Sequence, residues 1–167
     1  MRRILKSVSL ALLALALAAP TAALAQTVHA TLSSHHEVPA LATPGAGSFH
    51  AKVDVAAGTI TWQLEYASLE ADALQSHIHF GQAGVNGGIS AFLCTNLGNG
   101  PAGTLACPVR SGTLSGVITA ATVIGPSGQG IAPGEFAALA TAILDGTAYV
   151  NVHSTAWPGG EIRGQIR

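Results

Sequence analysis

The stretch from residue 146 to residue 166, GTAYVNVHSTAWPGGEIRGQI, limits the possible folds of this chain more than any other segment. Its first part, residues 148–153, alternates small or apolar side chains with polar ones, the period of two that is typical of a half-buried strand. The turn residues Trp157-Pro158-Gly159-Gly160 break this pattern, and a second alternation then continues to Ile166. The sequence therefore predicts an antiparallel hairpin with one apolar and one polar face.

Strand patterns separated by Gly and Pro fill most of the rest of the chain. An alternating pair on either side of Ala57-Gly58 predicts a second hairpin. Helical spacing of apolar residues in 133–144 predicts one short helix. The strands are expected at residues 28–32, 48–55, 60–66, 76–80, 89–93, 112–119 and in the final hairpin. This order predicts an all-β protein, an antiparallel sandwich or barrel with Greek-key-type connections and one short helix.

The first 25 residues have the features of a secretory signal peptide. Basic residues at positions 2, 3 and 6 precede a short apolar run, and Ala23-Leu24-Ala25 is a small-x-small cleavage site. The run is short and ends at Pro20, which disfavours the alternative of an uncleaved membrane anchor. We expect residues 1–25 to be removed and residues 26–167 to form one periplasmic or secreted domain that is not inserted in a membrane.

Charge and cysteine content narrow the classes of partner and compartment. After residue 25 the chain has four basic and eight acidic side chains and no basic cluster, which excludes nucleic acid as an expected partner. The partner we expect is an unidentified protein or cell-surface ligand. The two cysteines, Cys94 and Cys107, flank a glycine-rich loop, and in an exported protein such a pair predicts a disulfide bond.

Several motifs of the chain together resemble the CHRD (chordin-type) domain family. They are Glu37-Val38-Pro39, the hairpin around Gly58, the run His77-Ile78-His79-Phe80-Gly81 and the final hairpin, in the family's order. The resemblance implies an immunoglobulin-like β-barrel with distant similarity to copper,zinc superoxide dismutase. It implies no activity, because bacterial members mostly have no assigned role.

Three histidines form a candidate metal site. His77 and His79 are two residues apart on a predicted strand, so both imidazoles project from one face, and His153 ends another strand. Three neutral imidazoles suit copper or zinc, and the His-x-His and Val-His pattern resembles the copper strands of the dismutase. No histidine occurs between His79 and His153 to bridge to a zinc ion, so dismutation is not expected. The alternative is that these histidines only form hydrogen bonds that hold the sheet.

Other polar residues of the hairpin favour structural roles. Glu37, Glu161 and Arg163 are expected to supply an Arg–carboxylate bridge that ties the irregular Glu37-Val38-Pro39 segment to the last strand. Asn151 and His153 are expected to pin the long turn before Glu161. No catalytic residues and no cofactor are predicted, because the sequence has no Ser-His-Asp order, no phosphate loop and no Cys-His nucleophile arrangement. The sequence thus favours a binding or structural module, with a mononuclear copper or zinc protein as the alternative.

Overall fold

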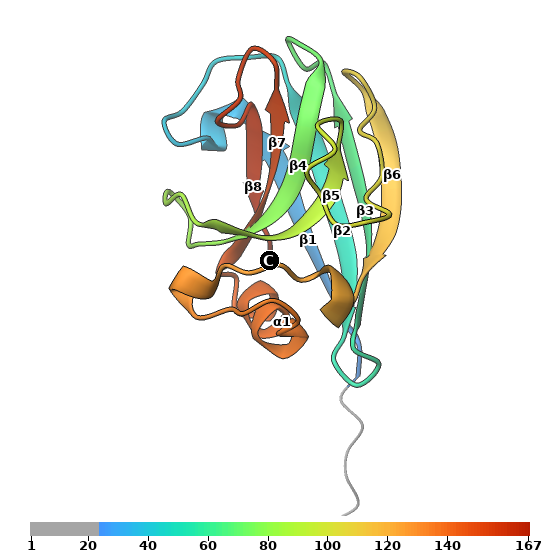
Figure 1. Ribbon diagram of the computed structural model, residues 1–167. Coiled ribbons are helices and arrows are strands. Elements are labelled where there is room, and N and C mark those ends of the chain that lie inside the picture. The colour runs from blue at the N-terminus through green and yellow to red at the C-terminus, as the bar shows by residue number, and fades with distance from the viewer. Residues whose placement is uncertain (1–23) are drawn as a thin grey trace, which may run out of the picture.

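The computed structural model describes residues 24–167, in which eight antiparallel strands form one strongly curved sheet (Figure 1). The predicted signal peptide, residues 1–25, lies almost wholly outside the described residues. The strands are β1 (Gln26–Ser33), β2 (Ala46–Asp54), β3 (Thr59–Ala67), β4 (Ala73–Phe80), β5 (Gly88–Thr95), β6 (Gly112–Ile118), β7 (Ala148–Ser154) and β8 (Ile162–Gln165). Short 3₁₀ turns occur at Ser34–His36, Ala120–Thr122 and Ser127–Gln129, and the α-helix α1 spans Phe136–Leu144.

The strand order is β5-β4-β7-β8-β1-β2-β3-β6, and the sheet curls into a nearly closed barrel. An isolated antiparallel bridge between Ala91 of β5 and Val123, which follows β6, joins the two ends of the sheet. The predicted all-β antiparallel fold with one helix is confirmed. Both predicted hairpins are present, as β2–β3 and β7–β8.

The interior of the barrel is apolar because alternate residues of each strand point inward. Along β2 and β3 every second side chain is buried, as the period of two predicts. Phe49, Ile60 and Leu64 have no solvent exposure, and neither do Ile78 of β4 and Val150 of β7. This continuous core is what gives the barrel its hydrophobic stabilisation.

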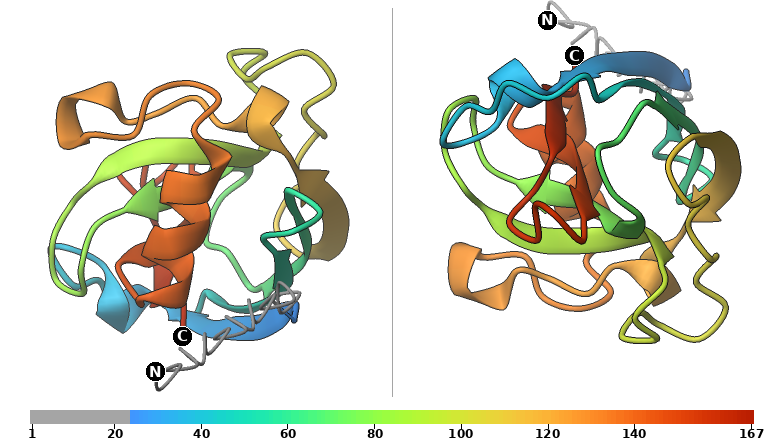
Figure 2. Two further views of the ribbon diagram at one scale, coloured as in Figure 1. Left: turned by 90° about the horizontal axis from the view of Figure 1, so that it is seen from below. Right: turned by 90° about the horizontal axis from the view of Figure 1, so that it is seen from above.

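The helix α1 lies across one end of the barrel (Figure 2). It buries Phe136, Leu139 and Ile143 against the core. The helix was predicted to begin near Pro133, but it begins at Phe136, because residues 133–135 form a turn in which Gly134 has φ 87°. None of the helices in the described part of the chain is long and apolar enough to cross a membrane.

The predicted disulfide joins Cys94 of β5 to Cys107 in the loop before β6. The same loop is hydrogen-bonded to the end of β5: Thr95 N–H donates to Leu105 O at 2.8 Å, and Cys107 N–H donates to the Asn96 side-chain oxygen at 3.0 Å. The glycine-rich loop is therefore fixed against β5 by one covalent bond and several hydrogen bonds.

The outer face of β7 departs from the half-buried strand that the alternation predicts. All seven residues of β7 are buried, including the polar Tyr149, Asn151 and His153. The segments around Glu37, Gly87 and Pro158 contact this outer face through hydrogen bonds. Alternation with a period of two indicates that a strand has one apolar and one polar face. It does not indicate whether water or loops cover the polar face.

Candidate metal centre and its polar surroundings

The register of β4 and β7 brings the three predicted metal-binding histidines to the outer face of the sheet. His77 and His79 of β4 lie opposite Asn151 and Tyr149 of β7. His153 lies two residues beyond Asn151 on the same strand, so its side chain points to the same face as the others. Diagonal neighbours across an antiparallel pair are within reach of large side chains, which allows the imidazoles to meet.

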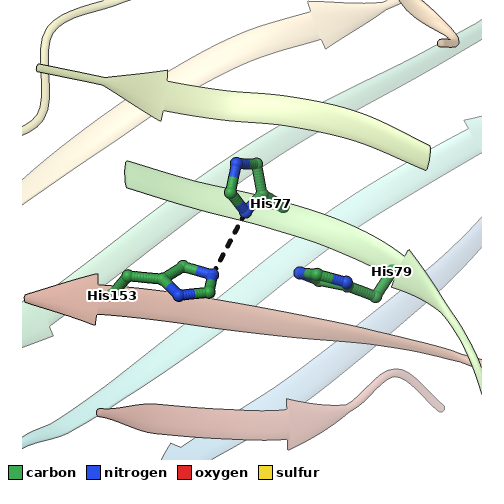
Figure 3. Close-up of side chains that lie close together, drawn as sticks. All are labelled: His77, His79 and His153. Atoms are coloured by element: carbon green, nitrogen blue, oxygen red, sulfur yellow. Dashed lines mark hydrogen bonds between the residues drawn. The ribbon is translucent and has the colours of Figure 1, made fainter. Parts of the chain in front are cut away.

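The three imidazoles converge on one point, as Figure 3 shows. One ring nitrogen from each of His77, His79 and His153 lies within 4.8 Å of the others. The closest pair, Nδ1 of His77 and Nε2 of His153, is 3.2 Å apart. Imidazole nitrogens that share a zinc or copper ion at about 2 Å are about 3 to 4 Å from one another. A small shift of His79 toward the other two would therefore complete a three-nitrogen site.

Backbone carbonyls fix which nitrogen two of these rings direct into the cluster. His79 Nδ1–H donates to Gly87 O at 3.0 Å, and His153 Nδ1–H donates to Pro158 O at 2.9 Å. A neutral imidazole carries one proton, so Nε2 of both rings has a free lone pair. Because His153 Nε2 can only accept, His77 Nδ1–H donates to it in this arrangement. Moving the His77 proton to Nε2 would direct a third lone pair into the cluster.

The histidines are buried and neutral. His77 has no exposed surface, and His79 and His153 are 8% and 7% exposed. Burial, with the neighbouring His153 and His79, lowers the pKa of His77 to about 2. Burial lowers the pKa of His79 to about 4 against the opposing effect of the Gly87 carbonyl, and burial also lowers the pKa of His153. Neutral imidazole is the form that binds metals.

Tyr149 and the Gly87 peptide hold His79 in place. The Tyr149 ring stacks on the His79 ring with centroids 4.8 Å apart and planes 4° from parallel. The Tyr149 hydroxyl accepts the Gly87 N–H at 3.1 Å, so both rings bond to the same residue. A Cβ atom on Gly87 would lie 1.7 Å from Phe80 O, so only glycine fits here. The sequence is rich in glycine between residues 81 and 88, but this pattern does not show what Gly87 does.

A buried ion pair lies on the other side of Tyr149. The guanidinium of Arg163 lies 4.2 Å from the Tyr149 ring centroid, and its Nε is 3.3 Å from Glu37 Oε2. Arg163 also donates to Val85 O at 3.2 Å and to the Asn86 side chain, while Asn151 donates to the other Glu37 oxygen. Burial raises the pKa of Glu37, and Arg163 opposes that shift. The predicted bridge between the Glu37 segment and the last strand is this pair.

Glu161 and the adjacent pair His35-His36 do not join the cluster. Glu161 is fully buried, and its Oε1 accepts the Glu70 N–H at 2.7 Å rather than pairing with Arg163. His36 Nδ1–H donates to the Arg163 carbonyl at 3.3 Å, whereas His35 is exposed. The two histidines lie in the 3₁₀ turn Ser34–His36 and not on the strands that carry the cluster.

The donor set suits a borderline or soft divalent metal better than a hard one. Three imidazole nitrogens are typical ligands of copper and zinc, whereas calcium and magnesium take oxygen ligands. Hydrogen bonds from His79 and His153 to carbonyls are the kind of support that orients imidazole ligands. A buried nitrogen with no hydrogen-bond partner, Nε2 of His79, is directed to the cluster and is free to ligate.

A comparison with protein-family models gave a match. The family model described as CHRD domain matches residues 28–166, nearly all of the described chain. Neither the comparison with curated proteins nor the comparison with solved structures found a match.

Replacing Glu37 tests the buried ion pair. In Glu37→Gln the Arg163 guanidinium keeps its position but loses its counter-charge, and both side chains are at most 5% exposed. We expect the free energy of unfolding to fall by about 3 kcal/mol, because an unpaired buried charge is costly. The matched control is Asp72→Asn, which breaks the exposed Arg110–Asp72 pair and should cost less than about 1 kcal/mol. Equal small losses in urea denaturation would contradict the assignment.

The buried histidines predict a loss of stability on acidification. His77 and His79 have lowered pKa values in the folded chain, whereas in the unfolded chain they titrate near 6.5. Below pH 6.5 the unfolded state therefore binds protons that the folded state does not. Between pH 7 and pH 5 each of these histidines should cost about 2 kcal/mol of unfolding free energy. Urea denaturation with a chelator present would measure it, and a pH-independent value would contradict it. The exposed His29→Gln variant should retain the full effect.

Proposed function

Since the chain belongs to the CHRD domain family, we propose that it is an exported binding module whose own ligand is a copper or zinc ion, held by His77, His79 and His153. The observation that carries the proposal is the convergence of three buried, neutral imidazoles with ring nitrogens within 4.8 Å of one another. Hydrogen bonds within the sheet could be made without bringing three imidazoles to one point.

Two further features support a metal ligand. The carbonyls of Gly87 and Pro158 fix the tautomers of His79 and His153 so that each offers Nε2 to the same point. The stacking of Tyr149 on His79 restricts rotation of that ring. Ligands ordered before binding lose less conformational entropy when the ion arrives, which raises affinity.

A bound copper ion would supply one-electron chemistry, and a zinc ion would supply Lewis acidity. Superoxide dismutation is not part of the proposal. The residues between His79 and His153 include no histidine that could bridge a second metal, and the domain has twice as many acidic as basic side chains after residue 25, which disfavours attraction of an anionic substrate. The proposed role is therefore binding of the metal.

The competing function is a module for an unidentified protein or cell-surface ligand, in which the histidines only hold the sheet. The hydrogen bond between His77 and His153, 3.2 Å long, favours it, because it satisfies two ring nitrogens without a metal. It leaves Nε2 of His79 buried without a partner, whereas Nε2 of His77 lacks a partner with or without a metal. Buried polar atoms of that kind are uncommon, so this reading accounts for less of the geometry.

Metal titration separates the two functions. Chelator-treated protein, titrated with Cu(II) and with Zn(II) by calorimetry, should bind one equivalent of at least one ion. Binding should be lost in His79→Ala and in His153→Ala, because each removes one of three ligands. The control is His50→Ala, an exposed histidine of β2 outside the cluster, which should bind as the parent does. Circular dichroism checks that each variant is folded. Binding by neither ion, or binding that survives both cluster substitutions, would contradict the metal site.

Export is the second part of the proposal. The cleavage site Ala23-Leu24-Ala25 directly precedes β1, whose first residue is Gln26, and the Cys94–Cys107 disulfide fits an oxidising compartment. The expected product has a mass that corresponds to residues 26–167 with one disulfide. Intact-mass spectrometry of protein recovered from the periplasm or the medium would measure it. A mass that includes Met1 to Ala25 would contradict cleavage.

A further inference from the structure

A groove of about 560 Å³ lies on the outer face of β1 and β8, apart from the histidine cluster. Its floor includes Thr31 of β1 and Gln165 of β8. One wall is the segment at Glu37-Val38 and the other is the loop at Ala83-Gly84, and both segments lie on the left of the barrel in Figure 1. The volume is within the range of small-molecule sites in proteins.

Positive and hydrogen-donating side chains are concentrated in this groove. Of the four basic residues after residue 25, two, Arg163 and Arg167, line it. Three of the seven histidines of the chain, His29, His35 and His36, line it as well. Of the eight acidic side chains, all of which lie in the described residues, Glu37 alone is among the lining residues. Basic side chains thus outnumber acidic ones in the groove, whereas acidic side chains outnumber basic ones in the domain as a whole.

The one acidic side chain that lines the groove is already paired. Glu37 pairs with Arg163, and Arg163 also donates to the carbonyl of Val85 and the side chain of Asn86. The side chains of Arg167, His29 and Thr31 make no hydrogen bond to other described residues. The free side chains of the groove therefore carry mostly hydrogen-bond donors. A ligand that matches them carries mostly hydrogen-bond acceptors.

The backbone places two of these free donors next to each other. His29 N–H donates to Arg167 O at 2.8 Å, and Arg167 N–H donates to His29 O at 2.9 Å. The pair continues the sheet past β8, so backbone hydrogen bonds fix both residues to the barrel. Because a guanidinium binds a carboxylate through two parallel hydrogen bonds, Arg167 is the natural anchor for an acid group. Val38 and Ala83 in the walls offer apolar contact for a carbon skeleton.

We propose that this groove is a binding site for a small organic acid, with Arg167 and His29 binding its carboxylate and Val38 and Ala83 contacting its carbon chain. The proposal goes beyond metal binding and does not depend on it, because the groove and the cluster of His77, His79 and His153 share no residue.

Succinate and inorganic phosphate are the probes for this site. With chelator-treated protein, succinate should bind saturably at millimolar concentration in calorimetry and shift the NMR signals of the His29 ring but not those of His77. Arg167→Gln should weaken succinate binding about tenfold by removing the paired hydrogen bonds. The matched control is Arg110→Gln, an exposed arginine outside the groove, which should leave the affinity unchanged.

Several outcomes would overturn the proposal. They are the absence of saturable succinate binding, equal binding in the parent and Arg167→Gln, and equal weakening in Arg110→Gln. Tighter binding of phosphate than of succinate would also overturn it, because the apolar walls would then contribute nothing. The metal titration is a separate experiment. An absence of succinate binding would leave the proposed metal binding standing, and an absence of metal binding would leave the proposed acid site standing.

Discussion

The ion pair between Glu37 and Arg163 connects segments that are far apart in the chain. It joins an irregular segment near the start of the chain to the last strand, and both side chains are almost fully buried. Asn151 in β7 bonds to the same carboxylate, and Arg163 holds the loop at Val85-Asn86. Without this pair, neither covering segment would have a charged anchor on the sheet.

The same contact explains why a polar layer can be stable outside an apolar barrel. Burying histidine, asparagine, glutamate and arginine costs solvation free energy unless each is paired. Here the loops supply carbonyl acceptors, the strands supply the side chains, and Tyr149 lies between Arg163 and His79 with one ring face toward each. The histidine cluster and the ion pair are thus two ends of one packed layer that share Tyr149 as a neighbour.

The sequence predicted the strands well because alternation is a local property. The hairpins β2–β3 and β7–β8, the single helix and the Cys94–Cys107 pair all follow from neighbouring residues and composition. The Glu37–Arg163 bridge could be proposed because few charges were available to pair. The helix start was placed too early, since a proline at position 133 fits either a turn or a first helical residue.

The sequence could not show that the three histidines converge, or that loops cover the outer face of β7. That His77 and His153 meet depends on β4 pairing with β7 in one register, and these strands are separated by about seventy residues of chain. Whether Tyr149 and Asn151 face water or loops depends on where distant segments fold back. The groove between Glu37-Val38 and Ala83-Gly84 could not be predicted from the sequence either, because its lining residues come from three separate segments.

The bond between Cys94 and Cys107 has a consequence for how copies of this protein behave toward one another. β5 is a terminal strand of the sheet, and an uncovered terminal strand offers unpaired N–H and C=O groups to any strand of another molecule. Here the tethered loop at Leu105 covers one end of that strand, and the bridge from Ala91 to Val123 covers its middle. Oxidation thus fixes the cover over one end of a strand that could otherwise pair with another molecule, and a reducing compartment would leave that end held by hydrogen bonds alone.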